Sequence, residues 1–167
     1  GGPPATVILK LYKDGSVNLK MGASDIGTGT KTVMAQVAAE ELGVHPAVIQ
    51  IENADTATTQ FATPSGGSKT VPTEAPTVRN AAISLKRELL RMAAEDLEAN
   101  EEDLSYVGDE VVVRDNPAKK VKIKEISGLQ KRGEVIGVGY RGPNIEGKVT
   151  NPFAAHFCEV EVNLRTG

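Results

Sequence analysis

A stripe of apolar residues in the middle of the chain constrains the fold more than any other feature of the sequence. Its members are separated by steps of four and three residues: Val78, Ala82, Leu85, Leu89 and Met92. This spacing places them on one face of an α-helix, so we predict a long amphipathic helix over about residues 77–99. A helix of this kind must bury its apolar stripe, and a sheet is the natural partner.

The residues before this helix predict a hairpin, a shorter helix and a strand. They are a hairpin of residues 5–13 and 16–21 around Asp14-Gly15, a helix over residues 30–42, and a short buried strand over residues 48–51. An Asp-Gly pair between alternating apolar residues is a strong hairpin signal. Gly43 is suited to the position after a helix end, and Pro46 prevents the helix from continuing.

The residues after the long helix predict mainly strands. They are a hairpin of residues 104–107 and 110–114 around Gly108-Asp109, a basic alternating strand over residues 119–124, a short helix ending near Lys131, a glycine-rich connection over residues 137–151, and an alternating strand over residues 153–164. The expected fold class is therefore α+β: a two-layer structure in which two main helices cover a mixed β-sheet, with additional β-hairpin elements. We expect a hairpin–helix–strand–helix core over residues 1–100, and further strands with the glycine-rich connection over residues 101–167.

The composition excludes several classes of function. With 40% hydrophobic and 25% charged residues, the chain is typical of a soluble globular domain. The net charge of −3 gives no reason to expect nucleic acid or a membrane as a partner. Cys158 is the one cysteine and His45 and His156 are the two histidines, so the sequence predicts neither an intrachain disulfide nor a zinc site. A reducing, cytoplasmic compartment is the expected location.

Two glycine-rich loops supply the chemistry of a binding site. The first is Gly22-Ala23-Ser24-Asp25-Ile26-Gly27-Thr28-Gly29-Thr30-Lys31-Thr32, and the second is Thr63-Pro64-Ser65-Gly66-Gly67-Ser68-Lys69-Thr70. Each loop leads into a helix and offers backbone N–H groups, hydroxyls and one lysine, which suits an oxyanion or a phosphate. We expect the loops to lie near each other and to share one polyanionic ligand.

Neither loop is a standard nucleotide-binding motif. Gly22 and Gly27 have the spacing of a P-loop, but Thr28 stands where that motif requires lysine. Gly27 and Gly29 begin a dinucleotide fingerprint, but Thr32 occupies the position of its third glycine.

Structural roles for the loop residues remain open at this point. The two glycines of the first loop can serve only to shape a turn, and Lys31 and Lys69 can be ordinary solvated side chains. Asp25 would repel a phosphate, so we expect it to stabilise the turn. The hydroxyl residues can act as helix caps, which is compatible with donating to a phosphate: Thr30, Thr32, Ser68 and Thr70.

Four segments in order resemble the molybdenum hydroxylases, the family of xanthine dehydrogenase and aldehyde oxidoreductase. They are residues 25–44, the Ser65–Thr70 loop, Arg141-Gly142-Pro143-Asn144, and residues 153–166. The resemblance implies that the chain is part of the molybdopterin-binding domain of a large catalytic subunit. Enzymes of this family hydroxylate aldehydes or N-heterocycles with oxygen taken from water.

The resemblance also implies a cofactor and a set of residues that bind it. The cofactor is molybdopterin with molybdenum, in its cytosine dinucleotide form, and the implied cofactor-binding residues are Gly27, Thr28, Gly29, Thr30, Thr32, Ser65, Gly66, Gly67, Ser68, Lys69 and Thr70. The first loop commonly reads Gly-Gln-Gly in the family. Thr28 replaces that glutamine here, which affects the role of this one residue more than the family assignment.

The resemblance places the catalytic base and the substrate loops outside this chain. The family's catalytic glutamate lies in a Gly-x-Gly-Glu segment, whereas Gly137-Val138-Gly139-Tyr140 carries tyrosine at that position and comes too early. We therefore assign no catalytic and no metal-ligating residue, and expect the chain alone to be inactive. The expected partners are the rest of the large subunit, iron–sulfur and FAD subunits or domains, and a second copy of the full-length protein.

Two alternatives remain open from the sequence. One is a non-enzymatic module that binds a phosphate-bearing ligand or a nucleotide in the same loops. The other is a subunit-assembly domain that docks through the long helix. A strand pattern that ends in the turn signal Arg165-Thr166-Gly167, together with a first residue other than methionine, leads us to expect a piece excised from a longer polypeptide.

Overall fold

The computed structural model describes residues 3–142, 147 and 153–167. The main sheet has four strands in the order β3-β2-β1-β7: β3 is Ile49–Asn53, β2 is Val17–Met21, β1 is Thr6–Tyr12 and β7 is Glu134–Tyr140. β1 pairs antiparallel with β2 and β7, whereas β2 pairs parallel with β3. The sheet is therefore mixed, as the sequence predicts.

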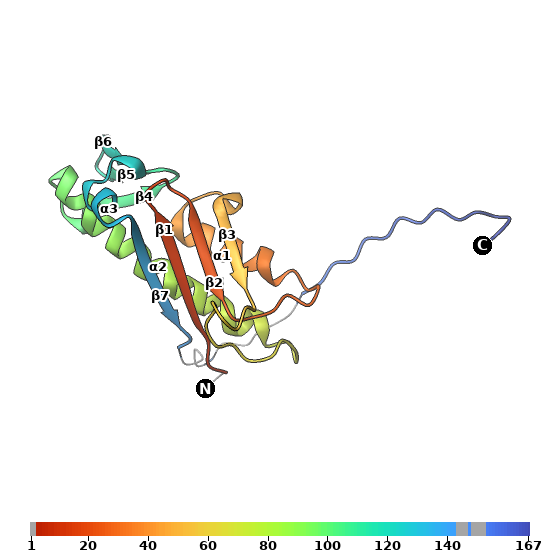
Figure 1. Ribbon diagram of the computed structural model, residues 1–167. Helices are drawn as coiled ribbons and strands as arrows, with labels where there is room; N and C mark the ends of the chain where they lie inside the picture. The colour runs from red at the N-terminus through yellow and green to blue at the C-terminus, as the bar shows by residue number, and fades with distance from the viewer. Residues whose placement is uncertain (1–2, 143–146, 148–152) are drawn as a thin grey trace.

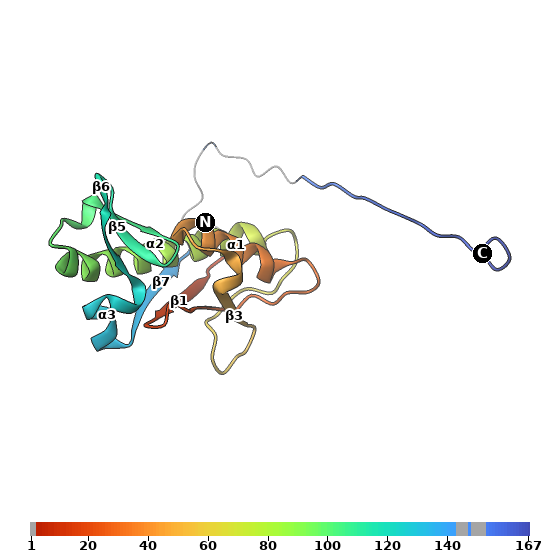
Figure 2. The ribbon, with the colours of Figure 1, turned by 90° about the horizontal axis from the view of Figure 1, so that it is seen from above.

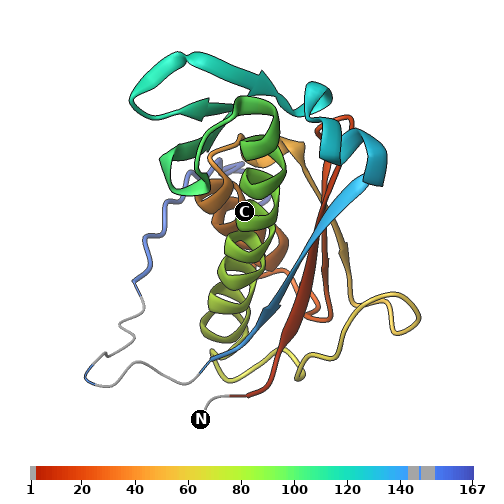
Figure 3. The same cartoon turned by 90° about the vertical axis from the view of Figure 1, so that its left-hand side faces the viewer.

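Two helices cover one face of this sheet (Figures 1 and 3). They are α1, Thr30–Leu42, and α2, Thr70–Leu97. The face of the sheet beneath them is apolar and buried, with Val7, Leu9 and Leu11 from β1 and Val17, Leu19 and Met21 from β2. The two-layer α+β arrangement expected from the sequence is confirmed.

A second, smaller sheet lies at one end of α2 (Figure 3). It consists of β4, Leu104–Val107, β5, Glu110–Val113, and β6, Asn116–Lys122, paired antiparallel in that order. The short helix α3, Ser127–Arg132, then leads into β7. Short 3₁₀ turns precede β3, β4 and α3 at Pro46–Val48, Glu101–Asp103 and Ile123–Glu125.

The long helix begins seven residues before the expected start at residue 77, and it contains prolines. Pro72 lies in the first turn of α2, where backbone N–H groups have no partner within the helix, so proline is tolerated there. Pro76 lies further inside the same helix and removes one intrahelical hydrogen bond. The apolar stripe itself is buried as expected, with Val78, Ala82, Leu85 and Leu89 inaccessible to solvent.

Three other expectations are corrected. Residues 134–140 form β7, so the first part of the expected glycine-rich connection is a strand, while residues 143–146 and 148–152 lie outside the described residues. β3 is an edge strand in which only Ile49 is buried. Residues 153–164 form no strand, and every residue from Phe153 to Gly167 is exposed (Figures 1 and 2).

Within the described residues, no helix combines the length and the apolar character that crossing a lipid bilayer requires.

Candidate functional site

The topology of the sheet brings the two glycine-rich loops together. β2 and β3 are parallel, with Met21 beside Asn53, so both strands end at the same edge of the sheet. The first loop follows β2, and the segment that contains the second loop follows β3. Ser65 donates its hydroxyl hydrogen to the backbone oxygen of Ser24 at 2.8 Å, and the two serine Oγ atoms are 3.3 Å apart. The expectation that the loops lie near each other is confirmed.

Gly22 permits this close approach, and sequence reasoning gave it no such role. A Cβ atom at Gly22 would lie 1.9 Å from the backbone oxygen of Gln60 and 2.9 Å from the backbone nitrogen of Ala62. Ala62 also forms a β-bridge with Ala5 beside β1. The chain that leads into the second loop therefore crosses directly against the start of the first, and only a residue without a side chain fits there.

Asp25 organises the first loop. Its Oδ1 accepts hydrogen bonds from the backbone N–H groups of Gly27 at 3.0 Å and Gly29 at 3.2 Å, and its Oδ2 accepts one from Lys31 at 3.1 Å. These hydrogen bonds lower the pKa of Asp25 below its usual value, and the bond from the amide of Lys31 has the largest effect. As expected, Asp25 stabilises a turn. The carboxylate thus already occupies amides that a phosphate would otherwise use.

The second loop is different, because two of its amides remain open. Within the described part of the chain, the backbone N–H groups of Gly67 and Ser68 donate to no protein acceptor. Gly67 has φ +59° and Ser68 has φ +55°, the left-handed region that is rare for a residue with a side chain. Both residues are exposed and lie just before the N-terminus of the 28-residue helix α2. This end of a helix attracts negative charge.

None of the loop hydroxyls caps a helix. Gly29 is the N-cap of α1 and Lys69 is the N-cap of α2, and neither makes a side-chain capping bond. Thr30 is buried, with its Oγ1 3.1 Å from that of Thr28. The other residues of the two predicted sets are at least partly accessible at the same end of the fold: Gly27, Thr28, Gly29, Thr32, Ser65, Gly66, Gly67, Ser68, Lys69 and Thr70.

Glu74, one turn into α2, is a buried acid that sequence reasoning missed. Glu74 is only 2% exposed to solvent. Among the described residues, its Oε2 atom has no hydrogen-bond partner. Burial raises the pKa of Glu74 to about 7, since a charged carboxylate is poorly solvated there. The helical pattern alone would place position 74 on the buried face, beside Val78. A glutamate at that position, however, is normally interpreted as a solvent-exposed residue.

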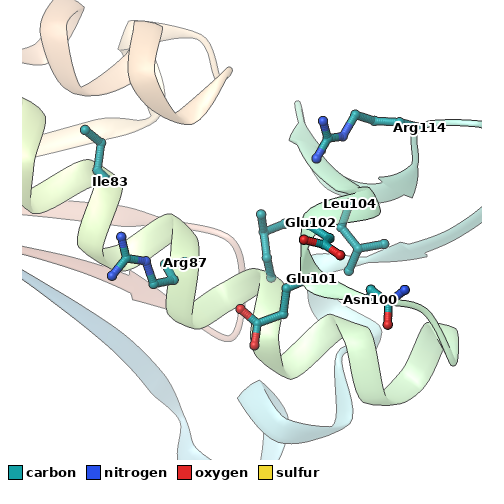
Figure 4. A pocket seen from close by; sticks show the side chains of 8 residues that line it. Ile83, Arg87, Asn100, Glu101, Glu102, Leu104 and Arg114 are labelled. Carbon is teal, nitrogen blue, oxygen red and sulfur yellow. The ribbon is translucent and has the colours of Figure 1, made fainter.

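A hollow of about 710 Å³ lies away from the loops (Figure 4). Its walls come from the middle of α2, the segment that leads into β4, and the residue after β5, and they mix both signs of charge: Ile83, Arg87, Leu90, Asn100, Glu101, Glu102, Leu104 and Arg114. It shares no residue with either glycine-rich loop. In the described parts of the chain, no group of three or more histidine, cysteine, aspartate or glutamate side chains is placed to hold a metal ion.

The sequence matches a known protein family over its whole length. Residues 1–167 match the family described as "Molybdopterin cofactor-binding domain". The carbon monoxide dehydrogenase large chain of Hydrogenophaga pseudoflava is 30% identical over 95% of this chain, which covers 20% of that protein. The putative xanthine dehydrogenase molybdenum-binding subunit of Escherichia coli strain K12 is 32% identical over 65% of this chain, covering 15% of that protein.

Solved structures agree with this assignment. A structure of Cu,Mo-CO dehydrogenase in its carbon monoxide reduced state superimposes with a TM-score of 0.73 at 29% identity, over 83% of this chain and 18% of that one. Quinoline 2-oxidoreductase from Pseudomonas putida 86 has the same fold, with a TM-score of 0.74 at 19% identity, over 84% of this chain and 19% of that one. The chain spans about a fifth of the length of these relatives. It belongs to the molybdopterin cofactor-binding domain family.

Proposed function

We propose that this chain is the part of a molybdenum hydroxylase large subunit that holds the phosphate end of a molybdopterin cofactor. One observation carries the proposal: the open amides of Gly67 and Ser68 lie at the N-terminus of the 28-residue helix α2. Unpaired N–H groups at a helix N-terminus are suited to a phosphate, because they combine hydrogen-bond donors with a partial positive charge. Lys69 adds a nearby full charge.

The two loops then have different tasks. In the second loop, the phosphates meet the amides of Gly67 and Ser68, the hydroxyls of Ser68 and Thr70, and the ammonium group of Lys69. Gly66 has no side chain to block the approach, and Ser65 ties this loop to the first by donating to the oxygen of Ser24. In the first loop, the carboxylate of Asp25 holds the backbone of Gly27 and Gly29 in a fixed turn. This loop therefore contributes a rigid wall and the accessible hydroxyls of Thr28 and Thr32, while the buried Thr30 supports the wall from within through its contact with Thr28. Glycine at 27 and 29 leaves the backbone accessible to the ligand.

The protein and the cofactor divide the chemistry. When bound, the cofactor supplies the molybdenum centre at which oxidation of the substrate takes place. The residues of this chain bind and orient it and keep its charged end out of bulk water. The proposed form of the cofactor is the cytosine dinucleotide, whose pyrophosphate would use more of the donors in the second loop than a single phosphate.

The activity proposed for the whole protein is hydroxylation of an aldehyde or an N-heterocycle with oxygen taken from water. Relatives named for carbon monoxide, xanthine and 6-hydroxypseudooxynicotine match this same region, so the region serves several substrates. We therefore propose that residues outside it select the substrate and supply the base. Iron–sulfur and FAD proteins or domains are the proposed electron acceptors.

The test is a substitution of Gly67 by valine in the full-length protein. A Cβ at Gly67 meets no atom within 4 Å, so valine causes no clash inside the chain but projects into the space where a phosphate must approach. Gly108→Val is the matched control: it has φ +65°, equally open surroundings, and a place in the β4–β5 turn away from the loops. The positive φ costs each variant about 1–2 kcal/mol.

We expect Gly67→Val to lose most of its molybdenum and pterin, measured by elemental analysis and cofactor extraction, while Gly108→Val keeps both. Lys69→Ala should retain more cofactor than Gly67→Val, because one partly exposed lysine is a single contribution among several donors. Full molybdenum content and activity in Gly67→Val would show that the second loop does not bind the cofactor.

A further inference from the structure

The outer edge of β7 is apolar, and within the described residues no strand pairs with it. One side chain contacts it near its end, where Asn80 of α2 donates from Nδ2 to the backbone oxygen of Tyr140 at 3.0 Å. β7 is the last strand of its sheet, with β1 on its other side. Arg141 donates its N–H to the oxygen of Ala5, and Lys13 donates to the oxygen of Gly133, both at 3.1 Å. Because backbone groups alternate in direction along an antiparallel strand, the N–H and C=O groups of Ile136 and Val138 point away from β1. They face the open edge.

This edge lacks the features that normally protect an edge strand. Exposed edges usually carry charged side chains or proline, which discourage the addition of another strand. After Glu134, β7 reads Val-Ile-Gly-Val-Gly-Tyr, and Ile136 and Tyr140 are 43% and 65% exposed. The opposite edge of the sheet differs, because β3 carries Gln50 and Glu52, and Glu52 is paired with Lys20 at 3.0 Å.

Residues 153–164 form a second segment that is suited to strand pairing. Residues 153–164 alternate like a strand, with Cys158, Val160 and Val162 on one face and Glu159 and Glu161 on the other. Among the residues that the structure describes, no strand pairs with this segment, and Val160 and Val162 are 76% and 60% exposed. Two alternating apolar segments that are both unpaired are each a site for strand addition.

We propose that residues 153–164 pair with the open edge of β7 as a fifth strand of the main sheet, within the same chain. The sequence between Tyr140 and Phe153 can span about 40 Å when extended, which is ample for the strand to return beside β7. Paired in this way, Val160 and Val162 extend the apolar surface formed by Ile136, Val138 and Tyr140. Glu159 and Glu161 then lie on the other face.

Hydrogen–deuterium exchange of the full-length protein, resolved to single amides, tests this pairing. The amides of Ile136 and Val138 should exchange about 100-fold more slowly than unpaired amides. Val160→Pro and Glu161→Pro are compared, because neighbouring amides of a strand face opposite edges and one of the two substitutions must remove a pairing N–H. At least one variant should release Ile136 and Val138. Val160→Ile, which keeps the strand preference, should not.

The amides of Val135 and Gly137 serve as the internal control. They face β1, so they should stay protected in every variant if the fold is intact. Fast exchange of Ile136 and Val138 in the unmodified protein would overturn the proposal. Slow exchange that neither proline alters would also overturn it, because another element would then cover the edge. Protection that rises with protein concentration would assign the edge to a second copy instead.

Discussion

At the scale of single residues, one aspartate makes the two glycine-rich loops differ in how their backbone amides are hydrogen-bonded. Their sequences look alike, yet Asp25 accepts hydrogen bonds from three backbone amides of the first loop, while the amides of Gly67 and Ser68 in the second stay open. A carboxylate in the chain fills the place that a bound anion would take. The second loop has no such residue, and it is the stronger candidate for a phosphate-binding site.

Glu74 allows a prediction about pH at the same scale. Its carboxyl has a pKa of about 7 in the folded protein and its ordinary value of 4.5 when unfolded. The folded state therefore holds a proton that the unfolded state has lost, and stability must fall as the pH rises from about 4.5 to about 7. The cost of burying the ionised form reaches about 3 kcal/mol above that range.

We expect Glu74→Gln to remove this dependence in cofactor-free protein. Glutamine resembles the protonated acid, so both proteins should unfold at similar urea concentrations at pH 4.5. At pH 8 the variant should be more stable by about 3 kcal/mol. An equal difference at both pH values would mean that Glu74 stays ionised in the folded protein, with a partner or water supporting its charge.

Residue patterns in the sequence predict some of these features and not others. The two loops, the turn role of Asp25 and the C-cap at Gly43 follow from local chemistry, since each depends on residues a few positions apart. The role of Gly22 depends on Gln60, which is distant in the sequence. The burial of Glu74 agrees with its place on the apolar face of α2, but its residue type is typical of exposed surface. Contacts between distant residues leave no mark in a local pattern.

At the scale of elements, β7 shows how glycine can be misread. Glycines at 137 and 139 predict a connection, because they weaken strand preference. In the structure they let α2 lie directly on the strand: a Cβ at Gly139 would be 2.0 Å from the backbone oxygen of Thr77, and one at Gly137 would be 2.1 Å from that of Ala81. The expected start of α2 near residue 77 followed the apolar stripe, which begins at Val78 and does not extend over the first turns of the helix.

We expect Gly139→Ala to lower the free energy of unfolding by about 3 kcal/mol, because the added methyl group meets helix backbone that cannot move aside cheaply. Gly142→Ala is the matched control. Its Cβ would have no atom within 4 Å, so its effect should stay within about 0.5 kcal/mol. Chemical denaturation of the two variants gives both values. Equal stability of the two would mean that α2 does not press on β7.

At the scale of the whole molecule, the position of the candidate site follows from one topological fact. Parallel pairing of β2 and β3 sends both strand ends to the same edge of the sheet, and the loops that follow lead into α1 and α2 on one face (Figure 1). The order of elements in the sequence suggests the two layers. The parallel pairing comes from contacts between strands far apart in the chain, and these become visible only in the structure.

In the proposed function, the N-terminus of α2 receives a phosphate of the cofactor. The most direct measurement is a high-resolution map of the full-length protein purified with its cofactor. We predict a phosphate oxygen within about 3 Å of the backbone nitrogens of Gly67 and Ser68, and the carboxylate of Asp25 still bound to the first loop. A cofactor whose phosphates lie elsewhere, with those two amides bound only to water, would show that the N-terminus of α2 is not the phosphate site.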